Sequence, residues 1–151
     1  MYKPDMASPK LEAPNDKERA WIADNLAKAT VMATKYGGDA EGLARPTLAG
    51  LDGLWAAMGA ALRAAGKDPN PLINLVGIAF GQHLVDAVGL EWVVATDEYG
   101  TELAVHGEPN HVLIYPCNLV AKRWESRDTG FLARIGAEIV RDINAARGRS
   151  A

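Results

Sequence analysis

Apolar side chains recur at helical spacing in three stretches of the first part of the chain. The stretch 16–36 carries an apolar face and is followed by two glycines, which readily end a helix. The stretch 47–65 has a narrower apolar stripe and ends before Gly66. The stretch 70–88 is apolar almost all round, a pattern typical of a helix that is buried on every side. The chain is therefore predicted to begin with three helices, the third of them central.

Two features of these helices bear on how they pack. In the third stretch, Gly77 and Gly81 lie four residues apart and leave a notch that another backbone can approach. In the second stretch, apolar residues alternate three and four apart, as in a seam that contacts a partner helix. The seam consists of Leu48, Leu51, Trp55, Met58 and Leu62. The partner helix can belong to the same chain or to a second copy of it.

After the third predicted helix the apolar period changes from helical to two, which indicates strands. The stretch 90–97 alternates, the acidic segment 97–100 supplies a turn that ends in glycine, and 101–106 returns. A second turn over 107–110 leads to a third apolar strand over 111–115. Because these connections are too short for parallel crossovers, the strands are predicted to form an antiparallel meander.

The remaining segments complete a single domain. A short helix or turn is predicted over 117–125, and a last helix over 129–146. The order of elements indicates an α+β fold, with three N-terminal helices, a three-stranded antiparallel β-meander and a C-terminal helix packed on the sheet. Residues 1–15 contain three prolines and mixed charges and are predicted to be a flexible arm, residues 16–147 one domain, and residues 148–151 a frayed tail.

The composition is that of an ordinary globular domain. The 151 residues are 48% hydrophobic and 23% charged, a balance that can build one core without disulfides. The single cysteine, Cys117, fits a reducing compartment, and the N-terminus lacks the apolar segment of a signal peptide. Since no apolar run reaches the length of a membrane span, we expect a cytoplasmic protein without membrane attachment.

The acidic residues are distributed unevenly along the chain. Although the net charge is only −3, the segment 86–108 contains six acids and no lysine or arginine. The six are Asp86, Glu91, Asp97, Glu98, Glu102 and Glu108. Phosphate contacts need clustered basic side chains, so this segment argues against nucleic acid as a partner and favours a basic protein.

The stretch 80–126 carries several short motifs. They are an aromatic–glycine pair, a Gly-Leu-x-Trp sequence before a strand, an Asp-x-x-Gly turn, and a strand that ends in proline before a Lys-Arg pair. With these motifs the stretch resembles a bacterial family of domains of unknown function, number 3806. The resemblance implies a small bacterial α+β domain and brings no assigned activity. The residue after the proline is usually aliphatic in that family, so Cys117 departs from the pattern, which weighs against a catalytic role for it.

The adjacent acids Asp97 and Glu98 admit two interpretations. Paired carboxylates act as acid and base when an apolar setting separates their pKa values. A hairpin turn is an exposed setting, and aspartate is common there because its side chain accepts hydrogen bonds from nearby backbone amides. We therefore interpret the pair as part of a turn, and the hairpin as a contact surface made by Glu91, Asp97, Glu98, Tyr99 and Glu102.

A small enzyme or a ligand-binding pocket is the alternative. Cys117 follows a strand and a proline, where the beginning of a helix would activate a thiol. His111, at the start of that strand, is too distant along an extended chain to act as its base. His83 lies within the apolar face of the third predicted helix, and a buried imidazole needs a hydrogen-bond partner. A pocket between this helix and the sheet would be lined by His83, Trp92 and Cys117.

Metal and cofactor sites are not predicted. No two histidines lie four residues apart on a helix, and no Cys-x-x-Cys pair is present. His106 and His111 flank the second turn and can lie across from each other, which we interpret as an ordinary surface pair. No glycine-rich phosphate loop stands between a strand and a helix.

A non-enzymatic protein-binding domain is the preferred hypothesis, because no combination of nucleophile, base and orienting group emerges. Its acidic hairpin would attract a basic partner, and an immunity or antitoxin-like role against a basic effector is one concrete form. The first alternative is a small-molecule-binding domain or small enzyme with the pocket near His83, Trp92 and Cys117. The second is a structural subunit of a homo-oligomer, joined through the seam of the second helix.

Overall fold

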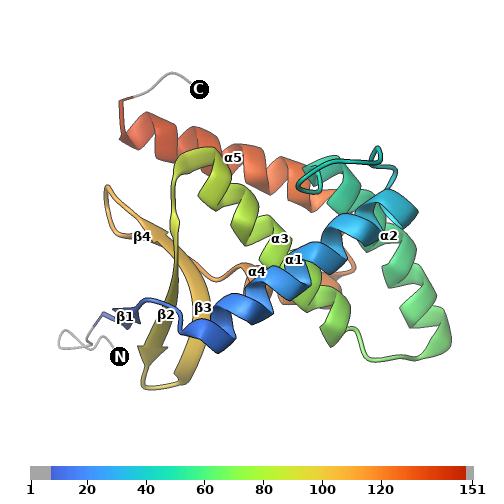
Figure 1. Cartoon of the computed structure of the whole chain (residues 1–151), viewed down its shortest axis with the longest axis horizontal. Coiled ribbons are helices and arrows are strands. Elements are labelled where there is room, and N and C mark those ends of the chain that lie inside the picture. Colours follow the sequence, from blue (N-terminus) through green and yellow to red (C-terminus); the bar gives the residue numbers. More distant parts are fainter. Residues whose placement is uncertain (1–7, 149–151) are drawn as a thin grey trace.

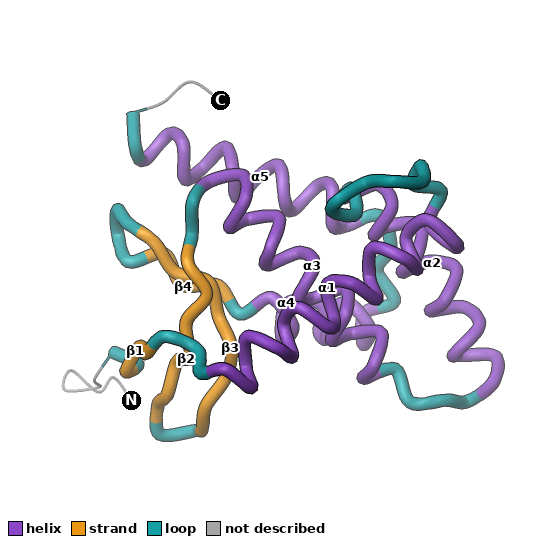
Figure 2. Tube along the Cα trace, in the orientation of Figure 1, coloured by secondary structure: helices purple, strands orange, loops and turns teal. Residues whose placement is uncertain are grey.

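The structure, a computed structural model, describes residues 8–148 as five helices beside one four-stranded sheet (Figure 1). The helices are α1 (Asp16–Gly37), α2 (Leu48–Ala65), α3 (Asn70–Val88), α4 (Pro116–Ser126) and α5 (Phe131–Ala146). The strands are β1 (Lys10–Glu12), β2 (Glu91–Asp97), β3 (Gly100–Gly107) and β4 (Val112–Ile114). The predicted α+β class is confirmed, and the sheet lies at one end of the helices (Figure 2).

Polar and glycine residues set the ends of the N-terminal helices. Asn15 begins α1 with a capping box, in which its side chain accepts from the N–H of Glu18 at 2.8 Å and its own N–H donates to the Glu18 carboxylate at 2.7 Å. Gly38, Gly66 and Gly89 follow α1, α2 and α3 in the left-handed conformation. These local preferences explain why the helix ends were predictable from the sequence.

Helix α3 is the centre of the core, as predicted. It packs against α1, α2, α4, α5 and β3, and Val76, Ile78 and Phe80 have no exposed surface. By length and composition it is also the one helix among the described residues that would suffice to cross a membrane, so the statement that no apolar run reaches that length is wrong. Its position between other helices and the sheet accounts for this apolar character.

The notch predicted on α3 is confirmed. A Cβ atom added to Gly77 would lie 2.7 Å from Cα of Cys117, and one added to Gly81 would lie 2.5 Å from Cη2 of Trp92. Both distances are shorter than any real contact, so only glycine permits the first turn of α4 and the indole of β2 to approach α3 this closely.

The sheet contains one strand more than predicted. Its order is β1-β2-β3-β4 with every neighbouring pair antiparallel, so the meander of β2, β3 and β4 is confirmed. The three-stranded prediction is wrong because Lys10–Glu12, from the predicted flexible arm, pairs with residues 94–96 of β2. A strand of three residues is too short to show an alternating pattern. Residues 1–7 of the predicted arm and 149–151 of the predicted tail lie outside the described residues.

Alternation along the strands gives the sheet an inner face and an outer face. The inner face joins the main core through Trp92, Leu103, Val105, Val112 and Ile114. On the outer face a separate, smaller apolar cluster is formed by Val93, Ala95, Ala104, Leu113 and Tyr115. The outer face is the side of the sheet on which the candidate site lies.

The C-terminal helix does not pack on the sheet, contrary to the prediction. Helix α5 packs against α2 and α3, while α3 and α4 contact strand β3. Asp52 of α2 draws α5 to the helical side, because its carboxylate accepts the N–H groups of Leu132 at 2.8 Å and Ala133 at 3.0 Å. Helix α5 reaches the sheet through Arg147, which follows its last residue and donates to the carbonyl oxygen of Glu108.

Candidate functional site

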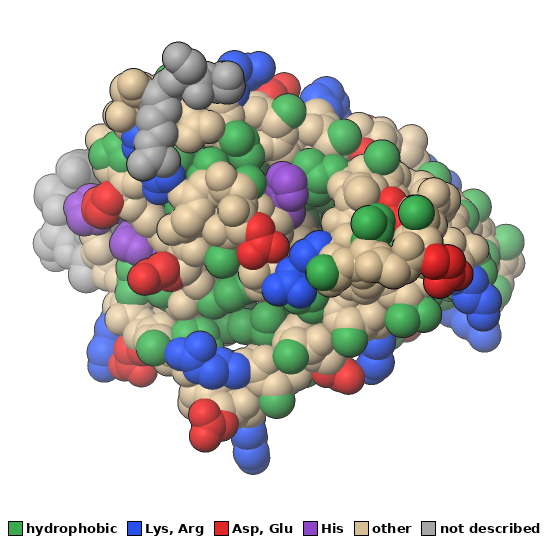
Figure 3. All heavy atoms as spheres, turned by 45° about the horizontal axis from the view of Figure 1, so that its top comes forward, with side chains coloured by type: hydrophobic (Ala, Val, Ile, Leu, Met, Phe, Trp, Pro, Cys, Tyr) green, Lys and Arg blue, Asp and Glu red, His purple; other side chains and the backbone are tan. Residues whose placement is uncertain are grey.

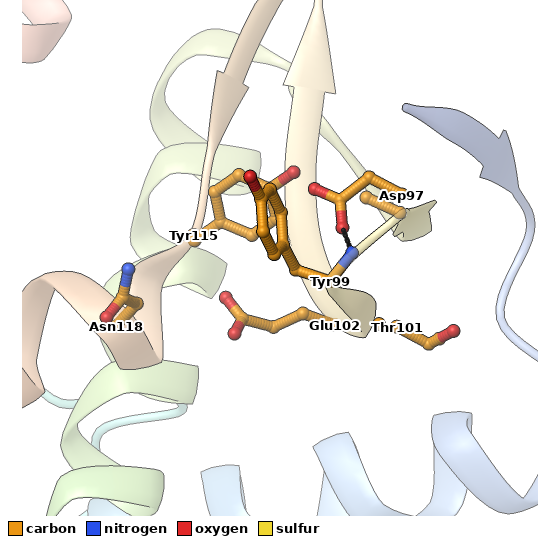
Figure 4. Close-up of a pocket in the computed structure, with 8 residues that line it drawn as sticks. Asp97, Tyr99, Thr101, Glu102, Tyr115 and Asn118 are labelled. Atoms are coloured by element: carbon orange, nitrogen blue, oxygen red, sulfur yellow. Dashed lines mark hydrogen bonds between the residues drawn. The ribbon is translucent and has the colours of Figure 1, made fainter. Parts of the chain in front are cut away.

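The β2–β3 hairpin borders an open cavity of about 240 Å³ on the outer face of the sheet (Figure 4). We call it the tip cavity. Its labelled lining consists of Asp97, Tyr99, Thr101, Glu102, Tyr115 and Asn118. These residues come from β2, the turn, β3, the residue after β4, and α4, so the cavity exists only when the sheet and α4 have assembled.

Asp97 has the turn role that the sequence predicted. Its Oδ1 accepts the backbone N–H of Tyr99 at 2.8 Å, and Gly100 completes the turn with a φ of 133° that favours glycine. The carboxylate of Asp97 also lies in the wall of the tip cavity. At the apex, the side chain of Tyr99 is 86% exposed, which leaves a large aromatic ring free for contact.

Glu102 of β3 and Tyr115, which directly follows β4, face the tip cavity. Glu102 lies opposite Ala95, and in Figure 4 its side chain extends toward Asn118, whereas Thr101 points away. Burial and then the charge of Asp97 raise the pKa of Glu102. Burial, followed by the charges of Asp97 and Glu102, raises the pKa of Tyr115. The cavity therefore concentrates negative charge that a bound cation would stabilise.

The negative charge of the tip cavity is not balanced by a basic side chain within residues 8–148. The ion pairs formed by these residues do not include Asp97, Glu98 or Glu102. A positive group between Asp97 and Glu102 would relieve the repulsion of the two carboxylates and would lie beside tyrosine rings. The geometry thus suits an ammonium or guanidinium group.

The structure divides the predicted contact surface into two parts. Asp97, Tyr99 and Glu102 line the tip cavity, and Glu98 lies beside it in the exposed turn. Glu91 begins β2 and is about 20 Å away along the extended strand, so it belongs to a different place on the outer face.

Tyr115 and Asn118 were not among the predicted site residues. Tyr115 lies two residues after Leu113 and therefore shares its outer-face orientation, a relation that the alternating pattern already contained. Its proximity to Glu102 depends on the pairing of β3 with β4, and that of Asn118 on where α4 begins. Neither relation can be obtained from spacing along the chain.

Two members of the predicted pocket, Trp92 and Cys117, fill the notch of α3. The indole ring of Trp92 lies against Gly81, and its Nε1–H donates to Oε1 of Gln82 at 3.0 Å. The backbone and Sγ of Cys117 lie against Gly77. These contacts pack α4 and β2 against α3 and leave little space between them.

Burial is the main cause of the pKa shifts of Cys117 and His83. Burial, aided by the charge of Glu102, raises the pKa of the Cys117 thiol to about 12, the opposite of what an activated nucleophile requires. His83 is half-buried, which lowers its pKa against the opposing effect of Asp86. Neither the tip cavity nor the groove described next is lined by His83, Trp92 or Cys117.

An apolar groove of about 460 Å³ lies between α1, α2 and α3. Its apolar lining consists of Met32, Met58, Leu62, Pro71, Leu72 and Leu75. Met58 and Leu62 belong to the seam predicted on α2, so the helices of the described chain cover this part of the seam incompletely.

The β3–β4 turn brings His106 and His111 together, as their flanking positions indicated. The two imidazole rings stack with centroids 6.3 Å apart and planes 24° apart. Nδ1 of His111 also lies 2.9 Å from Oε1 of Glu108. In Figure 3, histidine and acidic side chains lie together at the edge that carries the sheet, while basic side chains are scattered over the drawn face. The His-x-Glu spacing of residues 106 and 108 is a sequence signal for this cluster that the prediction of no metal site overlooked.

The fold and the tip cavity define a small α+β domain in which a helical core supports an antiparallel sheet. Residues 54–133, more than half of the chain, match the model of a family described as "Domain of unknown function (DUF3806)", and the chain belongs to this family. The match confirms the resemblance noted over 80–126 and extends it to most of α2 and the beginning of α5.

One solved structure, a crystal structure of a protein from Bacteroides thetaiotaomicron VPI-5482 at 1.50 Å resolution, is similar to this chain with a TM-score of 0.62 and 12% sequence identity. The similarity covers 93% of this chain and 50% of that chain, so this chain spans about half of its length. At this identity the likeness shows the fold alone. No curated protein matches the chain.

Proposed function

We propose that this domain binds a basic segment of a partner protein, with a lysine or arginine side chain seated in the tip cavity between Asp97 and Glu102. The observation that carries the proposal is the pair of carboxylates that shares one cavity with two tyrosine rings and has no ion-pair partner within residues 8–148. An immunity or antitoxin-like domain that covers the basic cleft of an effector is the concrete form of this function.

Each part of the tip cavity contributes a different term to such binding. The carboxylates attract the partner over a distance of about one Debye length, roughly 8–10 Å at ordinary ionic strength. The exposed ring of Tyr99 supplies apolar contact area and a face for a cation, as aromatic residues do at the centres of interfaces. The raised pKa of Glu102 means that a bound cation also favours its ionised form.

The test uses a short arginine- and lysine-rich peptide as the probe. Its binding to the wild-type domain is measured by isothermal titration calorimetry at low and high salt, beside a peptide of equal length with glutamine in place of each base. We expect binding of the basic peptide only, weaker at high salt. The double variant Asp97→Asn/Glu102→Gln should lose about tenfold or more in affinity, because both charges around the seated cation are removed.

A matched variant separates the cavity from net charge. Glu91→Gln/Glu125→Gln also removes two negative charges, but from exposed positions outside the tip cavity. We expect it to bind the basic peptide nearly as tightly as the wild type does. Equal losses in the two double variants would show that the peptide responds to overall charge, and the proposal would be abandoned.

Binding of an apolar small molecule is a second candidate function, favoured by the almost wholly apolar lining of the groove between α1, α2 and α3. An environment-sensitive apolar dye should fluoresce with the wild type and lose most of that signal in Met58→Lys. Sedimentation velocity in parallel identifies the homo-oligomer alternative, since a second copy seated on the seam would exclude the dye. A monomer that binds no dye contradicts both alternatives.

A further inference from the structure

The β3–β4 turn carries three side chains with metal-ligand chemistry, away from the tip cavity. His106 is near the end of β3, and Glu108 and His111 lie in the turn that follows. Two imidazole nitrogens and one carboxylate oxygen from these residues all lie within 4.8 Å of one another. Among residues 8–148 this is the one group of three such side chains that gathers so closely.

The backbone of this turn is anchored from α5. Nε and Nη2 of Arg147 donate to the carbonyl oxygen of Glu108 at 3.1 and 2.9 Å, and Nη1 donates to the carbonyl of Val88. The guanidinium thus holds the main chain of Glu108 while the carboxylate contacts His111. Asn110 and His111 adopt left-handed conformations with φ of 67° and 50°, which are uncommon outside glycine. These features fix the backbone that carries Glu108 and His111.

The donor set is one that zinc uses. Two histidines and one glutamate form known zinc sites in which a fourth position remains for water. Zinc–ligand bonds of about 2.0–2.2 Å place two ligand atoms of a tetrahedral site about 3.4 Å apart. The three ligand atoms here lie within 4.8 Å of one another, so they must come somewhat closer to bind the ion. The side chains of His111 and Glu108 are 86% and 59% exposed, so they can rotate by the small amount required without disturbing the core.

Glu91 supplies a carboxylate next to this group. It lies directly opposite His106 on the neighbouring strand, where paired residues have Cβ atoms about 5 Å apart. A carboxylate at that position can accept a hydrogen bond from the ring nitrogen that does not bind the ion, an arrangement that orients metal-bound histidines. Glu91 and Glu108 together also bring negative charge to a site whose histidines must be neutral to bind.

We propose that the β3–β4 turn is a zinc site in which His106, Glu108 and His111 bind the ion, water occupies the open position, and Glu91 orients His106. The site revises the interpretation of the two histidines as an ordinary surface pair. It lies at the end of the outer face remote from the tip cavity, so it stands independently of the proposed protein-binding function.

The test is a calorimetric titration of the tag-free full chain with zinc chloride in a non-chelating buffer. We expect one ion per chain with roughly micromolar affinity. His106→Ala and His111→Ala should each weaken binding by at least about tenfold, and Glu91→Gln by less than either. His83→Gln, which changes the remaining histidine far along the chain, should keep the wild-type affinity.

Cobalt substitution supplies a readout that does not depend on affinity. Cobalt(II) bound by nitrogen and oxygen ligands absorbs in the visible region without the intense near-ultraviolet band of a thiolate ligand. Circular dichroism of each variant checks that the fold is intact. The proposal is overturned if the wild type binds no zinc, or if the double variant His106→Ala/His111→Ala binds as tightly as the wild type. Loss of binding in Cys117→Ser would assign the ion to the thiol and overturn it equally.

Discussion

The two faces of the β2–β3 hairpin are made by alternate residues of the same strands, and they differ in packing and in chemistry. On the inner face, Trp92 and Val105 lie opposite each other and join the main core. On the outer face, Val93 and Ala104 form the middle of a small cluster, with the tip cavity at one end and the histidine-bearing turn at the other. The strands thus bury one face in the main core and carry exposed polar side chains at the two ends of the other.

The difference lies in how much room each face leaves. The inner face fits against α3 through Trp92 at Gly81, and α4 fits against the same helix through Cys117 at Gly77, so an added methyl at either glycine must displace indole or backbone. The ends of the outer face carry exposed polar side chains that can move with little cost. We therefore expect substitutions on the inner side to lower the free energy of unfolding, and substitutions on the outer side to alter binding instead.

The largest expected effect is the loss of Cys117 reactivity in the packed native protein. Its pKa of about 12, raised from 9.0, leaves about a thousandfold less thiolate near pH 8 than a free cysteine has. Because a thiolate of higher pKa is also a stronger nucleophile, which offsets part of this loss, we expect iodoacetamide to modify the native protein at pH 8 at least about tenfold more slowly than the same protein in denaturant, measured by mass spectrometry over time. Comparable rates in the two conditions would mean that α4 does not hold this thiol against α3.

Trp92→Ala should cause the largest loss of stability. Removing a core indole that fits against Gly81 and donates to Gln82 should lower the free energy of unfolding by about 3 kcal/mol. Tyr99→Ala is the matched change on the exposed turn, where the ring is 86% exposed, and should alter stability by less than about 0.5 kcal/mol. Urea denaturation of both variants measures the contrast, and similar losses would contradict the assignment of faces.

Gly77→Ala should cause an intermediate loss. The added methyl would lie 2.7 Å from Cα of Cys117, so the start of α4 must move, at a net cost of about 1–2 kcal/mol after the better helix propensity of alanine is included. Gly59→Ala is the control, because its Cβ would make an ordinary contact at 3.5 Å with Trp124. That variant should be neutral or up to about 1 kcal/mol more stable. Thermal unfolding of the pair distinguishes close packing from helix propensity.

Glu102→Gln should have the smallest effect on the free energy of unfolding, and that effect should depend on pH. Because the pKa of Glu102 is raised in the folded state, the folded protein binds more protons than the unfolded chain between the usual and the raised value. Wild-type stability therefore falls as pH rises through that window. The variant should be slightly more stable than the wild type above the window and equal to it below. Glu125→Gln, which changes an exposed acid on α4, is the control, and a pH-independent difference for Glu102→Gln would contradict the shift.

Several local features of the fold are determined by residues close together in the sequence. Gly66 and Gly89 end helices through their own backbone preference, and Asp97 forms its turn through a hydrogen bond two residues away. Gly77 and Gly81 predicted that another segment approaches α3 closely, because two small residues four apart share a helix face. Each of these conclusions depends on interactions within a few residues, which the local sequence contains in full.

Other particulars were missed because they join distant parts of the chain. Strand β1 exists through its pairing with β2, more than eighty residues later, and Asp52 directs α5 toward α2 across a similar separation. The tip cavity needs Tyr115 and Asn118 beside Glu102, a neighbourhood that β4 and α4 create by docking on β3 and α3.

Residue order therefore settled the α+β class, the bounds of most helices and the antiparallel meander, since periodicity and backbone preference act over short distances. Tertiary packing settled which face of the sheet is covered, which acids share a cavity, and how His106, Glu108, His111 and Glu91 come together. The physical reason is that strand register and helix docking depend on contacts between side chains that are far apart in the chain. A local sequence pattern contains only one partner of each such contact.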